Sequence, residues 1–318
     1  MSDFPWLTVL IALPLVGAAL LTVLPSGRDA LVKQFSLGVS IVVGVLTLVM
    51  AAMFEPGGAR FQFEEKYDWI PAFGVHWAVG VDGVALTLIV LSVILVPLVM
   101  LASWSEDDRS GGVDVPAKRS VKTYFALLLT LEAAMIGVFA ATDVFLFYVF
   151  FEAMLIPVYF IIGYFGGAQR SYAAVKFLLY SLFGGLIMLV AVIWLYPLSA
   201  RPEAEGGLGQ GTFLFSELSQ MNIDPTTAKW LFLGFFIAFA IKAPMVPVHT
   251  WLPTQPSRPR RARSSSSSAS WTRSARTGCC GSAWSCSRAP PSGPRRSCSD
   301  SPCSASSTAR SSRSGRST

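Results

Sequence analysis

Cysteine is absent from residues 1–253, and histidine occurs only twice in the whole chain. All five cysteines follow residue 253: Cys279, Cys280, Cys286, Cys298 and Cys303. The first 253 residues therefore offer no disulfide, no thiolate metal site and no cysteine nucleophile. They also contain no Cys/His metal spacing, no glycine-rich nucleotide fingerprint and no nucleophile elbow. The sequence thus gives no sign of nucleotide binding, metal binding or nucleophilic catalysis.

Charge is scarce and unevenly distributed. Charged residues make up 14% of the chain, hydrophobic residues 53%, and the mean hydropathy of +0.53 is typical of a membrane protein. From Thr254 onward there is no Leu, Ile, Val, Phe, Met, Tyr, Lys or Glu, but there are 12 Arg and one acid, Asp300. This tail carries a net charge of +11 and the whole chain +6, so residues 1–253 carry −5. The basic character belongs to the tail, and we expect no nucleic-acid partner.

Seven apolar runs of membrane length precede the tail. A helix needs about 20 apolar residues to cross a bilayer, and runs without alternation are helices rather than barrel strands. The first run follows MSDFP without a charged n-region or a cleavage site, so we interpret it as retained. We predict an all-α, polytopic membrane helix bundle with about seven transmembrane helices. The predicted spans are 6–25, 34–54, 82–104, 122–141, 143–163, 175–196 and 229–250.

The loops between these spans indicate an orientation. The first, third and fifth loops carry eight Lys and Arg, against four in the second and sixth. Because positive loops face the cytoplasm, the N-terminus is predicted outside. The fourth loop, near Thr142, is short and predicts a tight helical hairpin, whereas the sixth is the longest. Its FLFSELSQMNI segment is predicted to lie on the membrane surface.

Glu152 is the first candidate functional residue. It lies near the middle of the run DVFLFYVFFEAMLIPVYFIIGY, where an ionisable group costs roughly 2.5–3.5 kcal/mol on insertion scales. A cost of this size suggests a role in proton transfer. The alternative is a protonated carboxyl group in an inert helix–helix contact.

Lys242 is the second candidate, inside the seventh run and followed by Pro244 and Pro247. Proline removes a backbone donor and disfavours the preceding turn, so this helix is predicted to be broken there. Broken helices at membrane depth line polar cavities. Glu152 and Lys242 are therefore expected to form a pair whose proton occupancy depends on distance and hydration. The alternatives are a structural ion pair, or a lysine that snorkels to the surface.

Four further residues are secondary candidates for a proton path. His249 can relay protons near neutral pH, or cap the broken helix. Asp143 begins the fifth span and suits a helix N-terminal charge better than a relay. Glu132 lies within the fourth span, and Lys176 opens the sixth as an interfacial anchor, a contact to a neighbouring subunit or a relay. The pair Gly184-Gly185 indicates close helix packing.

Three motifs carry a family resemblance: FFEAMLIPVYFIIGYFGG, AAVKFLLYS and IKAPMVPVHTWLP. They resemble the antiporter-like membrane subunits of proton-pumping NADH:quinone oxidoreductase, respiratory complex I, and chain M (subunit 4) more than chains L or N. The resemblance covers residues 1–253. It implies a 14-helix fold of two inverted five-helix repeats, of which this chain would be a truncated version. It also implies that Glu152 and Lys242 are the fifth-helix carboxylate and seventh-helix lysine of a half-channel, with His249 and Asp143 on family positions.

The resemblance also implies a function. The chain would translocate protons within an NADH:quinone oxidoreductase, while NADH, FMN, iron–sulfur clusters and quinone would bind partner subunits and no cofactor would bind here. Its partners would be chains L and N, the small membrane subunits and the lipid bilayer, in a bacterial inner membrane. The alternatives are a subunit of a cation/proton antiporter, or a non-functional fragment. Glu152 and Lys242 do not discriminate between these.

Three segments are expected: residues 1–121 with the first three helices, 122–253 as an incomplete half-channel, and 254–318 as a disordered tail. The lysine and glutamate that the family places in its eighth and twelfth helices are missing.

A TCN serine codon, regrouped with the preceding base, becomes NTC and encodes Phe, Leu, Ile or Val, so Ser264–Ser268 can hide an apolar run. We therefore interpret the tail as the product of a shifted reading frame. A genuine disordered basic tail is the alternative.

Overall fold

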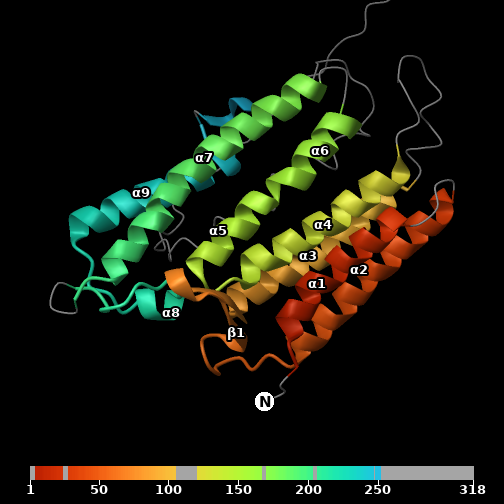
Figure 1. Ribbon diagram of the computed structural model, residues 1–318. Coiled ribbons are helices and arrows are strands. Elements are labelled where there is room, and N and C mark those ends of the chain that lie inside the picture. The colour runs from red at the N-terminus through yellow and green to blue at the C-terminus, as the bar shows by residue number, and fades with distance from the viewer. Residues whose placement is uncertain are drawn as a thin grey trace, which may run out of the picture. The chain divides into compact units, whose positions relative to one another are not determined.

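The computed structural model describes residues 4–23, 28–104, 120–166, 170–202, 206–246 and 248–251. Helices dominate this part of the chain (Figure 1). Its elements are α1 (Trp6–Val23), α2 (Asp29–Ala52), β1 (Gln62–Ile70), η1 (Pro71–Phe73), β2 (Val75–Val81), α3 (Gly83–Ala102), α4 (Val121–Ala140), α5 (Val144–Ala153), α6 (Leu155–Phe165), α7 (Arg170–Ser199), α8 (Phe215–Leu218), α9 (Pro225–Lys242) and η4 (Val248–Trp251).

Within the described residues, six helical segments are long and apolar enough to cross a membrane: α1, α2, α3, α4, the combined α5–α6 segment and α7. They coincide with the first six predicted spans, and the predicted membrane helix bundle is confirmed. The seventh run also forms a helix, α9, but it stops at Lys242 and is not among the six. Its end before Pro244 agrees with the predicted proline break.

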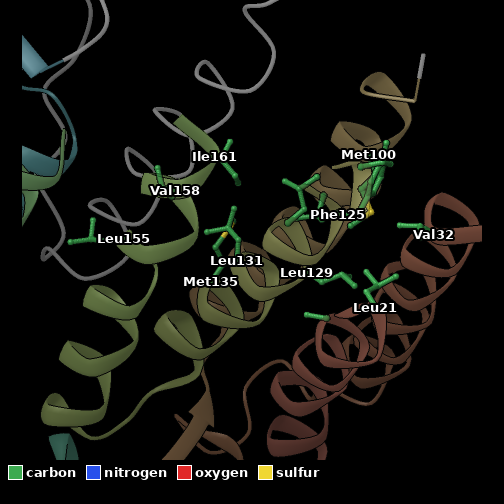
Figure 2. Close-up of a cluster of buried hydrophobic side chains, with 14 of the residues drawn as sticks. Leu21, Val32, Met100, Phe125, Leu129, Leu131, Met135, Leu155, Val158 and Ile161 are labelled. Atoms are coloured by element: carbon green, nitrogen blue, oxygen red, sulfur yellow. The ribbon is translucent and has the colours of Figure 1, made fainter. Parts of the chain in front are cut away.

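The first four helices pack side by side: α1 contacts α2 and α4, and α3 contacts α2 and α4 (Figure 1). Buried apolar side chains join these helices to α6, as Figure 2 shows for Leu21, Met100, Phe125, Leu131 and Val158. The predicted hairpin of the fourth and fifth spans is also present, because α5 follows α4 closely and packs against it. The α5–α6 segment thus lies between the α1–α4 group and α7, which contacts α5, α6 and α9.

A β-hairpin between α2 and α3 was not expected for an all-α fold. Strands β1 and β2 pair antiparallel, with Lys66 opposite Ala78, and Gly74 closes the turn at a φ of 60° that favours glycine. Val79 of β2 forms an isolated bridge with Ala141, and a second isolated bridge joins Asp143 to Leu214. The strand QFEEKYDWI is too charged to form an apolar run, so hydropathy gave no signal for it.

The fifth span differs from the continuous helix that we predicted. It is divided at Met154 into α5 and α6, two residues after Glu152. Pro157 has no backbone N–H to donate to the carbonyl of Ala153, and its ring crowds that carbonyl, which accounts for the interruption. Met154 keeps helical backbone angles, so this is a local interruption of one membrane-length segment beside the candidate carboxylate, whereas α9 ends at Lys242.

The predicted surface segment of the sixth loop is helical only over α8, Phe215–Leu218. Its first residues pack into the protein: Phe213 and Leu214 are buried, and the N–H of Val144 donates to the carbonyl of Phe213 at 2.9 Å. Backbone pairing with the α4–α5 connection holds these first residues in the fold, while Phe215, Ser216, Ser219 and Gln220 are exposed and the position at a membrane surface stays a prediction.

Candidate functional site

Glu152 lies in the last turn of α5, half-buried, where α5 packs against α7. Its Oε1 atom is buried and has no hydrogen-bond partner among the described residues. Ser181 of α7 is in the same condition, because its Oγ is buried and makes no hydrogen bond within the described chain. A polar atom buried without a partner is costly, so each of these two groups would gain from a new hydrogen bond.

Lys242 reaches the same place from the end of α9. Its Nζ donates to the backbone carbonyl of Phe151 at 2.5 Å and lies 3.2 Å from the centroid of the Phe151 ring. The residue after Phe151 is Glu152, so the Lys242 ammonium group lies at the last turn of α5. The structure therefore brings Lys242 to the backbone next to Glu152, and the exchange of a proton between the two side chains stays a prediction.

Two helix ends position the lysine. The carbonyls at the C-terminal end of α5 carry the negative end of the helix dipole, which favours a cation beside Phe151. Helix α9 ends where the N–H of Ala243 donates to the carbonyl of Phe239 at 2.7 Å, immediately before Pro244. The buried Trp251 then donates from its Nε1 to the carbonyl of Ile241 at 2.8 Å. A side chain thereby satisfies a carbonyl that the broken helix leaves open.

Gly185 of α7 directly faces the carboxylate of Glu152. A Cβ atom at this position would lie 2.8 Å from Oε2 of Glu152 and closer still to its Cδ and Oε1. Its neighbour Gly184 faces α9 instead, where a Cβ would lie 3.2 Å from the Ile241 side chain. The glycine pair predicted to mediate close packing therefore serves two different neighbours.

Asp143 is fully buried, at 0% exposure, and forms the N-terminal cap of α5. Its carboxylate accepts hydrogen bonds from the backbone N–H groups of Phe145, Leu146 and His76, at 2.8, 3.0 and 3.1 Å. Burial raises the pKa of Asp143, and these three hydrogen bonds lower it by less. These contacts support the capping role that we weighed against a relay.

Glu132 is a second carboxylate at membrane depth, on α4 and also at 0% exposure. Its Oε1 accepts a hydrogen bond from Ser40 Oγ of α2 at 2.8 Å, while its Oε2 has no hydrogen-bond partner within the described residues. Among the described residues, no hydrogen bond or ion pair joins Glu132 to Glu152 or Lys242.

The remaining candidate residues either lie away from Glu152 or belong in part to residues that the structure does not describe. Lys176, in the second turn of α7, has its Nζ 6.0 Å from the ring of Tyr172 and no recorded contact with Glu152 among the described residues. The backbone of His249 belongs to η4, whereas Pro247 lies outside the described residues. Groups of three or more His, Cys, Asp and Glu side chains placed to hold a metal are absent from the described residues.

Sequence reasoning missed Ser181 and the specific role of Gly185. A signal was available, since Ser181 precedes Gly185 by four residues and such a spacing places both on one face of a helix. Apart from Ser199 at its end, Ser181 is the only buried residue of α7 with a polar side chain.

Residues 141–257 match the family described as NADH:quinone oxidoreductase/Mrp antiporter, TM. Over 281 residues the chain is 46% identical to NADH-quinone oxidoreductase subunit M of Mycobacterium tuberculosis, covering 80% of this chain and 49% of that protein. It is 37% identical to subunit M of Rhodobacter capsulatus, over 78% of this chain and 47% of the relative. The chain therefore spans about half the length of these relatives.

Solved structures show the same fold. A chain of respiratory complex I from Thermus thermophilus aligns with a TM-score of 0.63 and 32% identity, covering 78% of this chain and 46% of that chain. The Mrp complex of Dietzia sp. DQ12-45-1b aligns with a TM-score of 0.59 over 78% of this chain and 25% of that chain. At 22% identity, the second similarity concerns the fold alone.

Proposed function

Because this chain belongs to the family of NADH:quinone oxidoreductase subunit M, we propose that it is a proton-translocating membrane subunit of such a complex. One observation carries the proposal. The ammonium group of Lys242 is bonded to the carbonyl beside Glu152, a carboxylate with a buried oxygen that no described group satisfies. An exchangeable charge pair next to two helix breaks suits proton transfer better than static packing.

In this proposal Glu152 holds the proton and Lys242 controls its release. Opposite charges favour each other's ionised forms, so the proton occupancy of Glu152 depends on how near the Lys242 ammonium lies. The breaks at Met154 and after Lys242 let each charged residue move without bending an entire helix. A conformational change that separates the two residues would favour proton uptake by Glu152, and their approach would favour release.

The redox chemistry belongs to partner subunits. NADH, FMN, iron–sulfur clusters and quinone would bind there, and chains L and N with the small membrane subunits would contact this chain in a bacterial inner membrane. The N-terminus would face outside, as the loop charges predict. His249, Lys176 and Glu132 remain candidates for the path that links the Glu152–Lys242 pair to the rest of the membrane.

The test is Glu152→Gln, introduced into the chromosomal gene of the source organism. Gln keeps the size of the side chain and removes the exchangeable proton. We expect NADH-driven proton pumping by membrane vesicles to fall about 100-fold, the lower limit for loss of a proton-transfer group. Glu55→Gln, at an exposed carboxylate, is the matched control and should pump normally. Wild-type pumping by Glu152→Gln, with normal assembly on native gels, would refute the role.

A cation/proton antiporter subunit is the second candidate function. The matched family description names Mrp antiporters, and the Dietzia complex shares the fold. Glu152→Gln does not separate the two functions, because either would use the same pair. Affinity purification of the tagged chain from its native membrane does so: redox-active subunits that copurify support the oxidoreductase, and their absence supports the antiporter.

A further inference from the structure

We propose that α7 provides the docking face for the Glu152 carboxylate, with Gly185 and Ser181 as positioning residues. Gly185 supplies the space and Ser181 supplies a hydrogen-bond donor. The inference rests on the proposed function and deepens it, because it assigns two residues that fix where the proton-carrying group lies.

The space at Gly185 is specific to the carboxylate. A Cβ there would lie less than 3.0 Å from Oε1, Oε2 and Cδ of Glu152, closer than a real Cβ approaches such atoms. The obstructing atoms form the end of a flexible side chain, so a methyl group would displace the carboxylate rather than disrupt the backbone. Gly185 itself is buried, and α5 and α7 are in contact (Figure 1). Any residue larger than glycine therefore moves Glu152 away from its present position.

Ser181 adds a hydrogen-bond donor to the same face. It lies one helical turn before Gly185, and residues four apart in a helix project from one side. Its hydroxyl and Glu152 Oε1 are both buried, and neither has a hydrogen-bond partner among the described residues. A hydroxyl group brought within hydrogen-bond distance would stabilise the ionised carboxylate, in addition to the charge of Lys242.

The experiment uses Gly185→Ala in the assembled complex, with Gly163→Ala as the matched control. Gly163 lies on α6, where a new Cβ would make ordinary contact with Ala174 at 3.5 Å. A displacement of about 1 Å in a reacting group can lower a rate about 100-fold, so we expect a 10- to 100-fold loss of pumping for Gly185→Ala. We expect little change for Gly163→Ala. Equal pumping by the two variants would overturn the role of Gly185.

A shortened acid separates positioning from simple packing. Glu152→Asp withdraws the carboxylate from α7, so Gly185→Ala should cause no further loss in the Glu152→Asp background. If the pumping losses of the two single variants multiply in the double variant, the inference is contradicted. If Gly185→Ala impairs assembly, Glu152→Asp should restore it, and a failure to do so would also contradict the inference. Should Glu152→Gln pump normally, the proposed function fails first. If Glu152→Gln is inactive but Gly185→Ala is normal, only the present inference fails.

Ser181 is tested by infrared difference spectroscopy. The carboxyl band that disappears in Glu152→Gln is assigned to Glu152, and its frequency reports hydrogen bonding to that group. Ser181→Ala should shift this band and lower pumping several-fold, whereas Ser181→Thr, which keeps the hydroxyl, should restore both. An unshifted band in Ser181→Ala would remove Ser181 from the docking face.

Discussion

Three carboxylates are held within the membrane-embedded part of the chain or at its edge, and they differ in how fully their oxygens are satisfied. Asp143 accepts three backbone hydrogen bonds. Glu132 has one bond, from Ser40, and Glu152 has a buried oxygen with no hydrogen-bond partner in the described chain. A satisfied carboxylate is fixed, whereas an unsatisfied one gains by moving or by changing its proton occupancy. This gradient distinguishes the cap from the proposed proton carrier.

Asp143→Asn tests the capping carboxylate through its pH dependence. Burial raises the pKa of Asp143, so the folded protein binds this proton more tightly than the unfolded chain does. Wild-type stability should therefore fall as pH rises from below the ordinary Asp value through the raised pKa, and the neutral Asn variant should not show this loss. Thermal melts of both proteins in detergent should show the Tm difference, variant minus wild type, increasing from pH 4 to pH 7. A constant difference would contradict the raised pKa.

Among the elements, the β-hairpin stabilises a helix that is distant in sequence. Glu65 of β1 accepts hydrogen bonds from the N–H groups of Leu7 and Thr8 in the first turn of α1, at 2.7 and 3.2 Å. The hydroxyl of Thr8 donates to the same carboxylate at 2.5 Å and accepts a bond from Trp77 Nε1 at 3.0 Å. The hairpin thus supplies an N-terminal cap that the α1 sequence lacks.

Glu65→Ala should remove this cap and destabilise α1. Loss of an N-cap side chain costs roughly 0.5–2 kcal/mol, and the unsatisfied N–H groups of Leu7 and Thr8 favour the upper end. Thermal unfolding of the detergent-purified chain should show a lower Tm for Glu65→Ala. Glu64→Ala, at the exposed neighbour on the same strand, should leave the Tm within error of wild type. Equal melting of the two variants would mean that Glu65 does not stabilise α1.

At the scale of the whole molecule, two compositions meet near residue 254. The family match ends at residue 257, just after the apolar composition gives way to the Arg- and Ser-rich tail. Residues 252–318 lie outside the described residues, and the predicted shift of the reading frame stays a prediction. The division of the chain into segments 1–121, 122–253 and 254–318 likewise stays a prediction, although the structure describes helices in the first two.

The gene itself tests the predicted frameshift. Sequencing across the codons for Leu252–Pro256 in independent isolates should reveal an inserted or deleted base. The corrected frame should encode a further apolar helix, since regrouped TCN codons give Phe, Leu, Ile or Val. An uninterrupted frame with the same tail in every isolate would defeat this prediction and favour a genuine basic tail.

The sequence by itself determined the membrane class, the first six spans and the end of the seventh helix, and it singled out Glu152 and Lys242, whose pairing stays a prediction. Each of these follows from local properties: apolar length, proline chemistry, and the cost of isolated charges in lipid. Hydropathy could not predict the hairpin, because charged residues such as Glu65 and Lys66 interrupt β1 and β2 is too short to form a membrane-length run. The break at Met154 was also missed, although Pro157 was visible, because a proline in an apolar run sometimes only bends the helix.

Only the tertiary structure decided which groups meet. It placed Gly185 against the Glu152 carboxylate, Gly184 against α9, and Glu65 on the first turn of α1. The sequence alone cannot assign different roles to two adjacent glycines, because each role depends on which neighbouring helix the glycine faces. Packing of α7 between α5 and α9 creates that difference. It thereby decides which residues surround the Glu152 carboxylate, whose place in an apolar run is already visible in the sequence.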